Sequence, residues 1–174
     1  METITKLEAA RRQLDQAIKL FFEGRDALSI HTLASAAQGI LRDIAKATGA
    51  QHLSILHDHP QISPEHRKDW VRAINAPRNF FKHADNDPNG TLKFSEIENE
   101  NLLLDSVLLY NTVAQQYLSA ANVYIGWFTT KNPELRGAVS SNQIGDYCVR
   151  NSISPDNKEK FLELIETKLL IEPV

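Results

Sequence analysis

Apolar residues recur at every third or fourth position over most of the chain, which is the spacing of one buried face of an α-helix. The first run predicts a helix that begins at Thr3 or Thr5 and ends before Gly24. A second run predicts a helix from about Asp26 to Thr48, with Gly49 as its stop. The inward positions of the two helices are Leu7, Leu14, Ile18, Phe21 and Phe22, then Ile30, Leu33, Ala37, Leu41 and Ile44.

Two further helices are predicted in the middle of the chain. Ser63-Pro64-Glu65 has the composition of a helix start, with Pro64 at the first helical position, and predicts a third helix that extends to about His83. Pro77 lies inside this helix and predicts a kink just before Arg78. A fourth and longest helix is predicted from about Glu96 to Phe128, with inward positions Leu103, Val107, Tyr110, Ala114, Tyr117 and Ala121.

Shorter helical pieces are predicted in the remainder of the chain. One starts at Asn132-Pro133-Glu134, another covers residues 142–149, and Ser154-Pro155-Asp156 caps a last helix. The inward positions of that last helix are Phe161, Leu162, Ile165 and Leu169. No stretch alternates as a β-strand does. We therefore predict a single all-α domain over residues 1–174, with a four-helix-type main bundle over 1–130 and a C-terminal helical extension over 131–174.

The composition is that of an ordinary globular protein. Of the 174 residues, 42% are hydrophobic and 24% are charged, and the formal net charge of -3 argues against a molecule that is cationic as a whole. Cys148 is the only cysteine, so no intrachain disulfide can form, and we expect it to be a small buried residue. Trp70 and Trp127 are expected to anchor the core or an interface. With no signal peptide and no apolar run near the roughly 20 residues that span a bilayer, the chain is predicted to be cytoplasmic, with no membrane partner.

Two groups of polar residues are predicted to be solvated rather than functional. Residues 50–62 read as a polar connection whose histidines have zinc-compatible chemistry but match no closed zinc site. These histidines are His52, His57 and His59. Early in the fourth predicted helix, Glu98, Glu100 and Asp105 are expected to face water near the helix start, where acidic groups are favoured.

The segment Arg78-Asn79-Phe80-Phe81-Lys82-His83 carries the strongest candidate chemistry. A histidine can act as a base near neutral pH, and an arginine offers a planar fork that fits phosphate oxygens. Such a pair can cleave RNA without metal, with His83 taking the proton from the 2′-hydroxyl and Arg78 offsetting charge on the phosphate. Asn79 would hold either partner or the phosphate. Residues five apart differ by about 140° around a regular helix, so bringing the pair together needs a kink or a loosened turn.

An arginine followed directly by a polar residue and, a few positions later, by a histidine near a helix end resembles the signature of the HEPN superfamily. The resemblance rests on Arg78, Asn79 and His83 and on the order of helices over the central bundle. It implies a helical bundle, a homodimer in which two motifs face each other across one cleft, and metal-independent ribonuclease activity in bacterial stress or defence. It also implies partners such as RNA or a cognate antitoxin-like protein. Other members of the superfamily have lost activity and serve as binding modules.

The residues after His83 match a different pattern, that of a calcium-binding loop. Oxygen ligands of such a loop would be Asp85, Asp87, Asn89, Thr91 and Glu96, with Gly90 at the sharp turn. Against it, Pro88 restricts the loop, Lys93 brings a positive charge, and the chain has no second loop. The same residues are typical of a plain turn between two helices, which is the favoured interpretation. No cofactor is therefore predicted, with calcium as the alternative.

Three functions follow from the sequence. The first is RNA binding or metal-independent RNA cleavage with Arg78, Asn79 and His83 as the catalytic set. The second is a non-enzymatic helical interaction module, in which Arg78 pairs with a carboxylate and His83 ends a helix, where a cation is favoured. The third is a calcium-binding helical protein.

Overall fold

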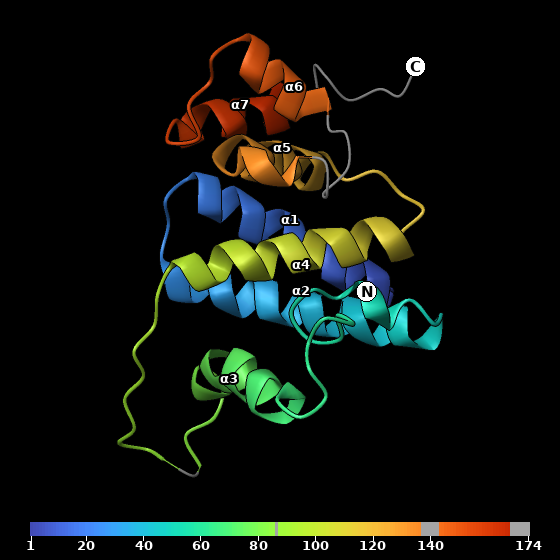
Figure 1. Ribbon diagram of the computed structural model, residues 1–174, viewed down its shortest axis with the longest axis vertical. Coiled ribbons are helices and arrows are strands. Elements are labelled where there is room, and N and C mark those ends of the chain that lie inside the picture. Colours follow the sequence, from blue (N-terminus) through green and yellow to red (C-terminus); the bar gives the residue numbers. More distant parts are fainter. Residues whose placement is uncertain (86, 137–142, 168–174) are drawn as a thin grey trace.

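The computed structural model describes residues 1–85, 87–136 and 143–167. Within these ranges it contains seven α-helices, two short 3₁₀ helices and no β-strand, which confirms the all-α prediction. The helices lie in three layers (Figure 1): α5, α6 and α7 form one, α1, α2 and α4 form the next, and α3 lies beyond α2. Among the described helices, none combines the length and the apolar character needed to cross a bilayer.

The first two helices of the central layer begin and end close to where the sequence predicts. Helix α1 spans Lys6–Phe22, and Thr5 caps it by accepting a hydrogen bond from the Glu8 N–H at 3.1 Å. Helix α2 spans Ala27–Ala47. Gly24 and Gly49 follow the two helices with φ angles of +65° and +77°, a backbone region that favours glycine.

The predicted long fourth helix is wrong, because the chain forms two helices there. Helix α4 spans Ile97–Val113 and α5 spans Ser119–Lys131. Between them the backbone is extended at Ala114 and Leu118, and both of these side chains are buried. The break lets α4 pack mainly on α2 while α5 turns away to cover α1 and to carry α6 and α7. The boundary between α4 and α5 is therefore set by the separate packing surfaces that bury the two helices, because no glycine or proline lies there.

The outer layer consists of η2 (Pro133–Leu135), α6 (Gln143–Arg150) and α7 (Lys158–Thr167) with α5. The α5–α6 contact is close, because a methyl group on Gly126 would lie 2.6 Å from Ile144 Cγ2. Trp127 lies in the core, 2% exposed, and its Nε1–H donates to the Pro155 carbonyl at 2.9 Å, which confirms its anchoring role. The predicted inward Leu169 lies outside the described residues.

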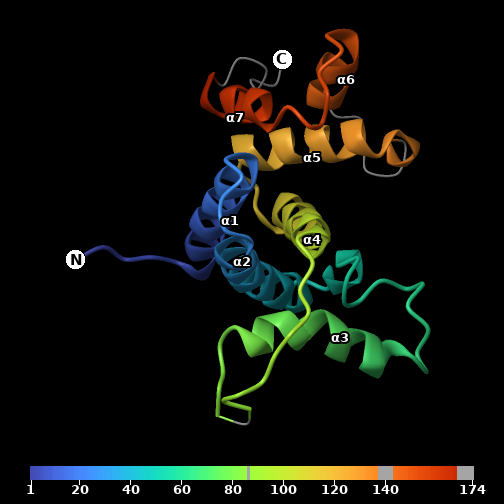
Figure 2. The same ribbon diagram turned by 90° about the vertical axis from the view of Figure 1, so that its left-hand side faces the viewer.

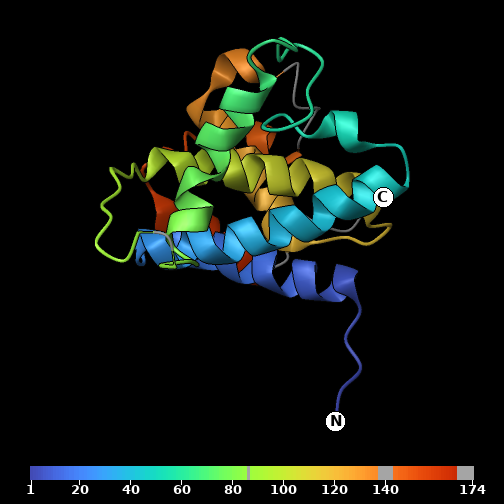
Figure 3. The same cartoon turned by 90° about the horizontal axis from the view of Figure 1, so that it is seen from below.

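Helix α3 spans Arg67–Phe80 and crosses α2 and α4 on the side away from α1 (Figures 2 and 3). It starts later than predicted, because Pro64 lies in a turn closed by the His66 N–H and the Ser63 carbonyl at 3.1 Å. Among the residues of α3, all of them described, Pro77 alone is buried. Because apolar burial holds this helix only weakly, polar contacts must fix its position.

Candidate functional site

A buried polar cluster joins α3 and the preceding connection to the bundle. Asp105 of α4 is 0% exposed, so the prediction that it faces water is wrong. Its carboxylate accepts hydrogen bonds from Gln38 Nε2 at 2.8 Å, Ser54 Oγ at 3.1 Å and the Ile55 N–H at 2.7 Å. Burial raises the pKa of Asp105, and the hydrogen bonds from Gln38 and the Ile55 N–H offset part of this rise. The Asp105 carboxylate thus fixes the segment that follows α2 to helix α4.

His57 is the second member of this cluster and is also buried, at 2% exposure, rather than solvated as predicted. The Gln38 amide nitrogen lies 3.1 Å from His57 Nδ1 and can only donate, so Nδ1 is the acceptor. His57 Nε2 then carries the proton and donates to Asn75 Oδ1 of α3 at 3.2 Å. Burial lowers the pKa of His57, which agrees with a neutral ring. We call Gln38, Ser54, His57, Asn75 and Asp105 the polar hub.

Two side chains at the start of α3 extend this attachment. The Arg67 guanidinium donates to the carbonyls of His57, His59 and Ile62 at 3.1–3.3 Å, so this cation is used within the fold. The Trp70 ring is 44% exposed, and its Nε1–H donates to the Leu56 carbonyl at 2.6 Å. Trp70 therefore anchors the segment between α2 and α3 rather than the core. The first turns of α3 are held only on the side that faces this segment.

The far end of α3 is fixed by a different buried histidine. The His31 ring of α2 meets Phe81 and Phe94 edge-to-face, with centroids 5.4 and 5.2 Å away. Its Nδ1 lies 3.0 Å from Asn99 Oδ1, and the Asn99 amide donates to the Ala27 carbonyl at 2.9 Å. Phe81 follows α3 and Phe94 precedes α4, so these contacts fix both ends of the intervening loop on α2.

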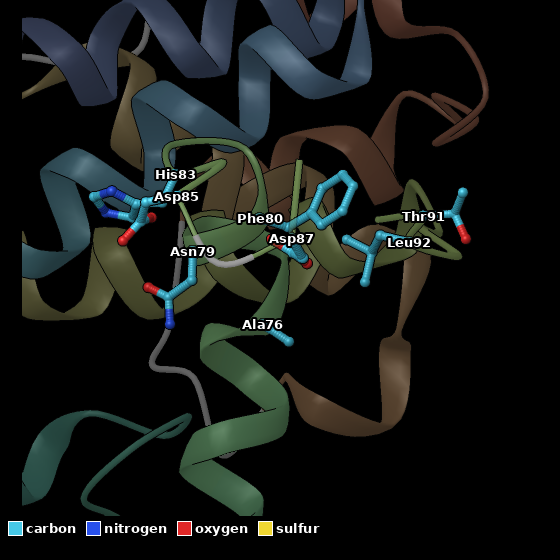
Figure 4. Close-up of a pocket in the computed structure, with 8 residues that line it drawn as sticks. All are labelled: Ala76, Asn79, Phe80, His83, Asp85, Asp87, Thr91 and Leu92. Carbon is cyan, nitrogen blue, oxygen red and sulfur yellow. The ribbon is translucent and has the colours of Figure 1, made fainter. Parts of the chain in front are cut away.

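The loop and the end of α3 enclose an open cleft of about 630 Å³ (Figure 4). From the helix side it is lined by Ala76, Asn79, Phe80 and His83, and from the loop side by Asp85, Asp87, Thr91 and Leu92. The His83 N–H donates to the Asn79 carbonyl at 3.0 Å, which continues the helical turn and keeps the two side chains on one side. The structure thus brings Asn79 and His83 together.

Arg78 does not line this cleft. Its guanidinium lies over α2, where a methyl group on Gly39 would be 3.1 Å from both Nη1 and Nη2. Within the described residues, the Arg78 side chain forms no hydrogen bond or ion pair, so the predicted carboxylate partner is absent there. Arg78 and His83 of one chain therefore face different directions, as the angle between positions five apart on a helix requires.

Four exposed polar residues lie in one row along the outward side of α3 and the turn that follows it: Lys68, Arg72, Asn79 and His83. Their separations of four, seven and four residues place them on one face of a helix. In the part of the chain that the structure describes, Lys68 and Arg72 form no ion pair. We call this row the α3 stripe. The regular spacing that joins Lys68 and Arg72 to His83 is the signal in the sequence that identifies the stripe.

The proposed calcium ligands are brought together only in part. Asp85, Asp87 and Thr91 line the cleft, whereas Asn89 and Glu96 do not. The Gly90 N–H donates to the Asp87 carbonyl at 2.8 Å, which makes a tight turn. Across the described ranges, no three His, Cys, Asp or Glu side chains are grouped as metal ligands. Cys148, in α6, is buried as predicted, and burial raises the pKa of its thiol.

Comparison of the chain with family models, with curated proteins and with solved structures gave no match. The HEPN resemblance therefore stays a prediction that rests on Arg78, Asn79, His83 and the helix order.

Proposed function

We propose that the protein binds RNA along the α3 stripe and cleaves it without a metal ion, with His83 as the base. The observation that carries this proposal is the continuity of the stripe with the cleft: exposed Lys68 and Arg72 lie in line with Asn79 and His83, which line the cleft. The distance from Lys68 to His83 along the axis is roughly 22 Å at 1.5 Å per residue. This length accommodates several nucleotides.

The two cations of the stripe supply the attraction for the phosphate backbone. Each is exposed, and the described residues provide no carboxylate partner for either. Binding of a polyanion to such cations releases counterions and weakens as salt rises. The net charge of -3 does not oppose this, because screening confines the field of exposed charges to about 10 Å at 0.1 M salt.

His83 would act on the RNA at the end of the stripe. Its ring accepts the proton of a 2′-hydroxyl, the 2′-oxygen bonds to the adjacent phosphorus, and the 5′-oxygen leaves and takes a proton from water. The products are a 2′,3′-cyclic phosphate and a 5′-hydroxyl end. The Asn79 amide would donate a hydrogen bond to a phosphate oxygen as charge develops there.

Arg78 takes part only in a rearranged or paired molecule. Its guanidinium would offset charge on the phosphate after it leaves Gly39, or from a second copy of the chain whose motif faces the same cleft. The homodimer is therefore part of this proposal. A helical module that binds without cleaving is the second candidate, and it is favoured by the direction of Arg78 away from His83 within one chain.

The test is incubation of the protein with a mixed RNA pool in EDTA, with His83→Ala, Arg72→Ala and the control His52→Ala beside it. His52 is exposed and lies outside the cleft, so its replacement should leave cleavage intact. We expect cleavage by the wild type, loss in His83→Ala, and weaker, less salt-sensitive binding in Arg72→Ala. Binding without cleavage would favour the second candidate, and absence of RNA binding would refute the proposed function.

A further inference from the structure

The cleft beside His83 contains acidic groups that would repel a phosphate. Asp85 and Asp87 both line it, on the loop side. A carboxylate that is unfavourable for the RNA backbone is a good acceptor for the N–H groups of a nucleobase. The cleft is therefore suited to a nucleobase, while the α3 stripe is suited to the phosphates. Its volume of about 630 Å³ lies in the range of small-molecule sites.

Phe80 supplies an aromatic wall. It is half-buried, and its ring contacts Phe81 edge-to-face with centroids 6.0 Å apart. Phe81 is held in turn by His31 and Phe94, so the Phe80 ring is supported from behind while it lines the cleft. Splayed-out bases of single-stranded RNA stack on side chains of this kind.

Asp87 supplies the hydrogen-bond acceptor for the base. The Gly90 N–H donates to the Asp87 carbonyl at 2.8 Å, and this turn fixes the position of Asp87 in the loop. Gly90 leaves room for the carboxylate, because a methyl group there would lie 2.6 Å from Asp87 Oδ2. Within the described residues, no cation or donor side chain pairs with Asp87. Its two oxygens are therefore available to a ligand.

The geometry of a carboxylate selects among the four bases. It accepts two parallel hydrogen bonds from adjacent N–H donors, and guanine offers these at N1 and N2 on its Watson–Crick edge. Adenine and cytosine each place a ring acceptor beside the amino donor, which a carboxylate repels. Uracil has one N–H between two carbonyls. We propose that the cleft binds the guanine base of single-stranded RNA, stacked on Phe80 and held by Asp87.

This assignment rests on the proposed function and names the substrate of the same site. We would measure the binding of uncleavable 2′-O-methyl pentanucleotides whose central base is guanine, hypoxanthine or adenine, between uridines. Hypoxanthine lacks only the N2 amino group. We expect the guanine oligonucleotide to bind about tenfold more tightly than the hypoxanthine one, as the loss of one hydrogen bond to a charged acceptor implies.

The variants distinguish recognition of the base from binding of the RNA backbone. Asp87→Asn should abolish the difference between guanine and hypoxanthine while keeping salt-dependent binding, and Phe80→Leu should weaken all three oligonucleotides alike. Asp43→Asn, at an exposed site on α2, is the matched control and should change nothing. Equal, salt-dependent binding of all three oligonucleotides to the wild type would overturn the guanine assignment alone. Absence of any binding would overturn the proposed function with it.

Discussion

Replacement of Asp105 by alanine should cost the protein a large part of its stability. The change removes an acceptor of four hydrogen bonds, and the three shortest come from Gln38 at 2.8 Å, Ser54 at 3.1 Å and the Ile55 N–H at 2.7 Å. Each buried donor left unpaired costs about 1–3 kcal/mol, so the three together cost roughly 3–9 kcal/mol. Relief of the burial of a carboxylate offsets part of this sum. We expect a net loss of about 3–5 kcal/mol, because the donors that remain are neutral and no uncompensated charge is left in the core.

The assay is urea denaturation at pH 7, with Asp43→Ala as the control. Asp43 is exposed on α2, so its removal should change the free energy of unfolding by less than about 0.5 kcal/mol. Hydrogen exchange should show the loss at the hub, with faster exchange at the Ile55 amide and through α3. A loss below about 1 kcal/mol, with exchange at Ile55 unchanged, would refute the view that Asp105 organises this region.

Three further predictions concern other parts of the fold. Burial lowers the pKa of His57 below 6.5, so below that pH the unfolded chain binds more protons than the folded chain. The free energy of unfolding should therefore fall as the pH drops from 6.5, and it should fall less steeply in His57→Gln. Equal pH dependence of the two proteins in urea titrations would contradict this. Gly126→Ala places a methyl group 2.6 Å from Ile144 Cγ2 and should cost about 1–3 kcal/mol in the same assay, whereas an unchanged midpoint would argue against the close α5–α6 contact. The Cys148 thiol is buried with a raised pKa and should react with a thiol reagent far more slowly in the native protein than in urea; equal rates would disprove its burial.

Local signals in the sequence were sufficient for the first two helices. Thr5 caps α1 through a side-chain oxygen, and Gly24 and Gly49 take up the positive φ angles that end α1 and α2. Each of these signals acts within a few residues. No such signal marks the break between α4 and α5, where Ala114 and Leu118 become extended because separate packing surfaces bury the two helices.

The polar hub could not be predicted for a related reason. Asp105 and His57 lie in segments whose local composition is that of solvated surface, and only the fold brings Gln38 and Asn75 to them. The candidate site was predicted in part: the structure places Asn79 and His83 in one cleft, as an interval of four residues allows. Arg78 lies on another side of the helix, where Gly39 makes room for its guanidinium.

The most direct test of the central claim is the chemistry of the RNA ends produced in EDTA. If His83 takes the proton from a 2′-hydroxyl, the wild-type protein leaves 2′,3′-cyclic phosphate and 5′-hydroxyl ends, and a single 2′-deoxy substitution at the cleaved position blocks the reaction. Products with 5′-phosphate ends, or cleavage that persists at the 2′-deoxy position or in His83→Ala, would contradict the account.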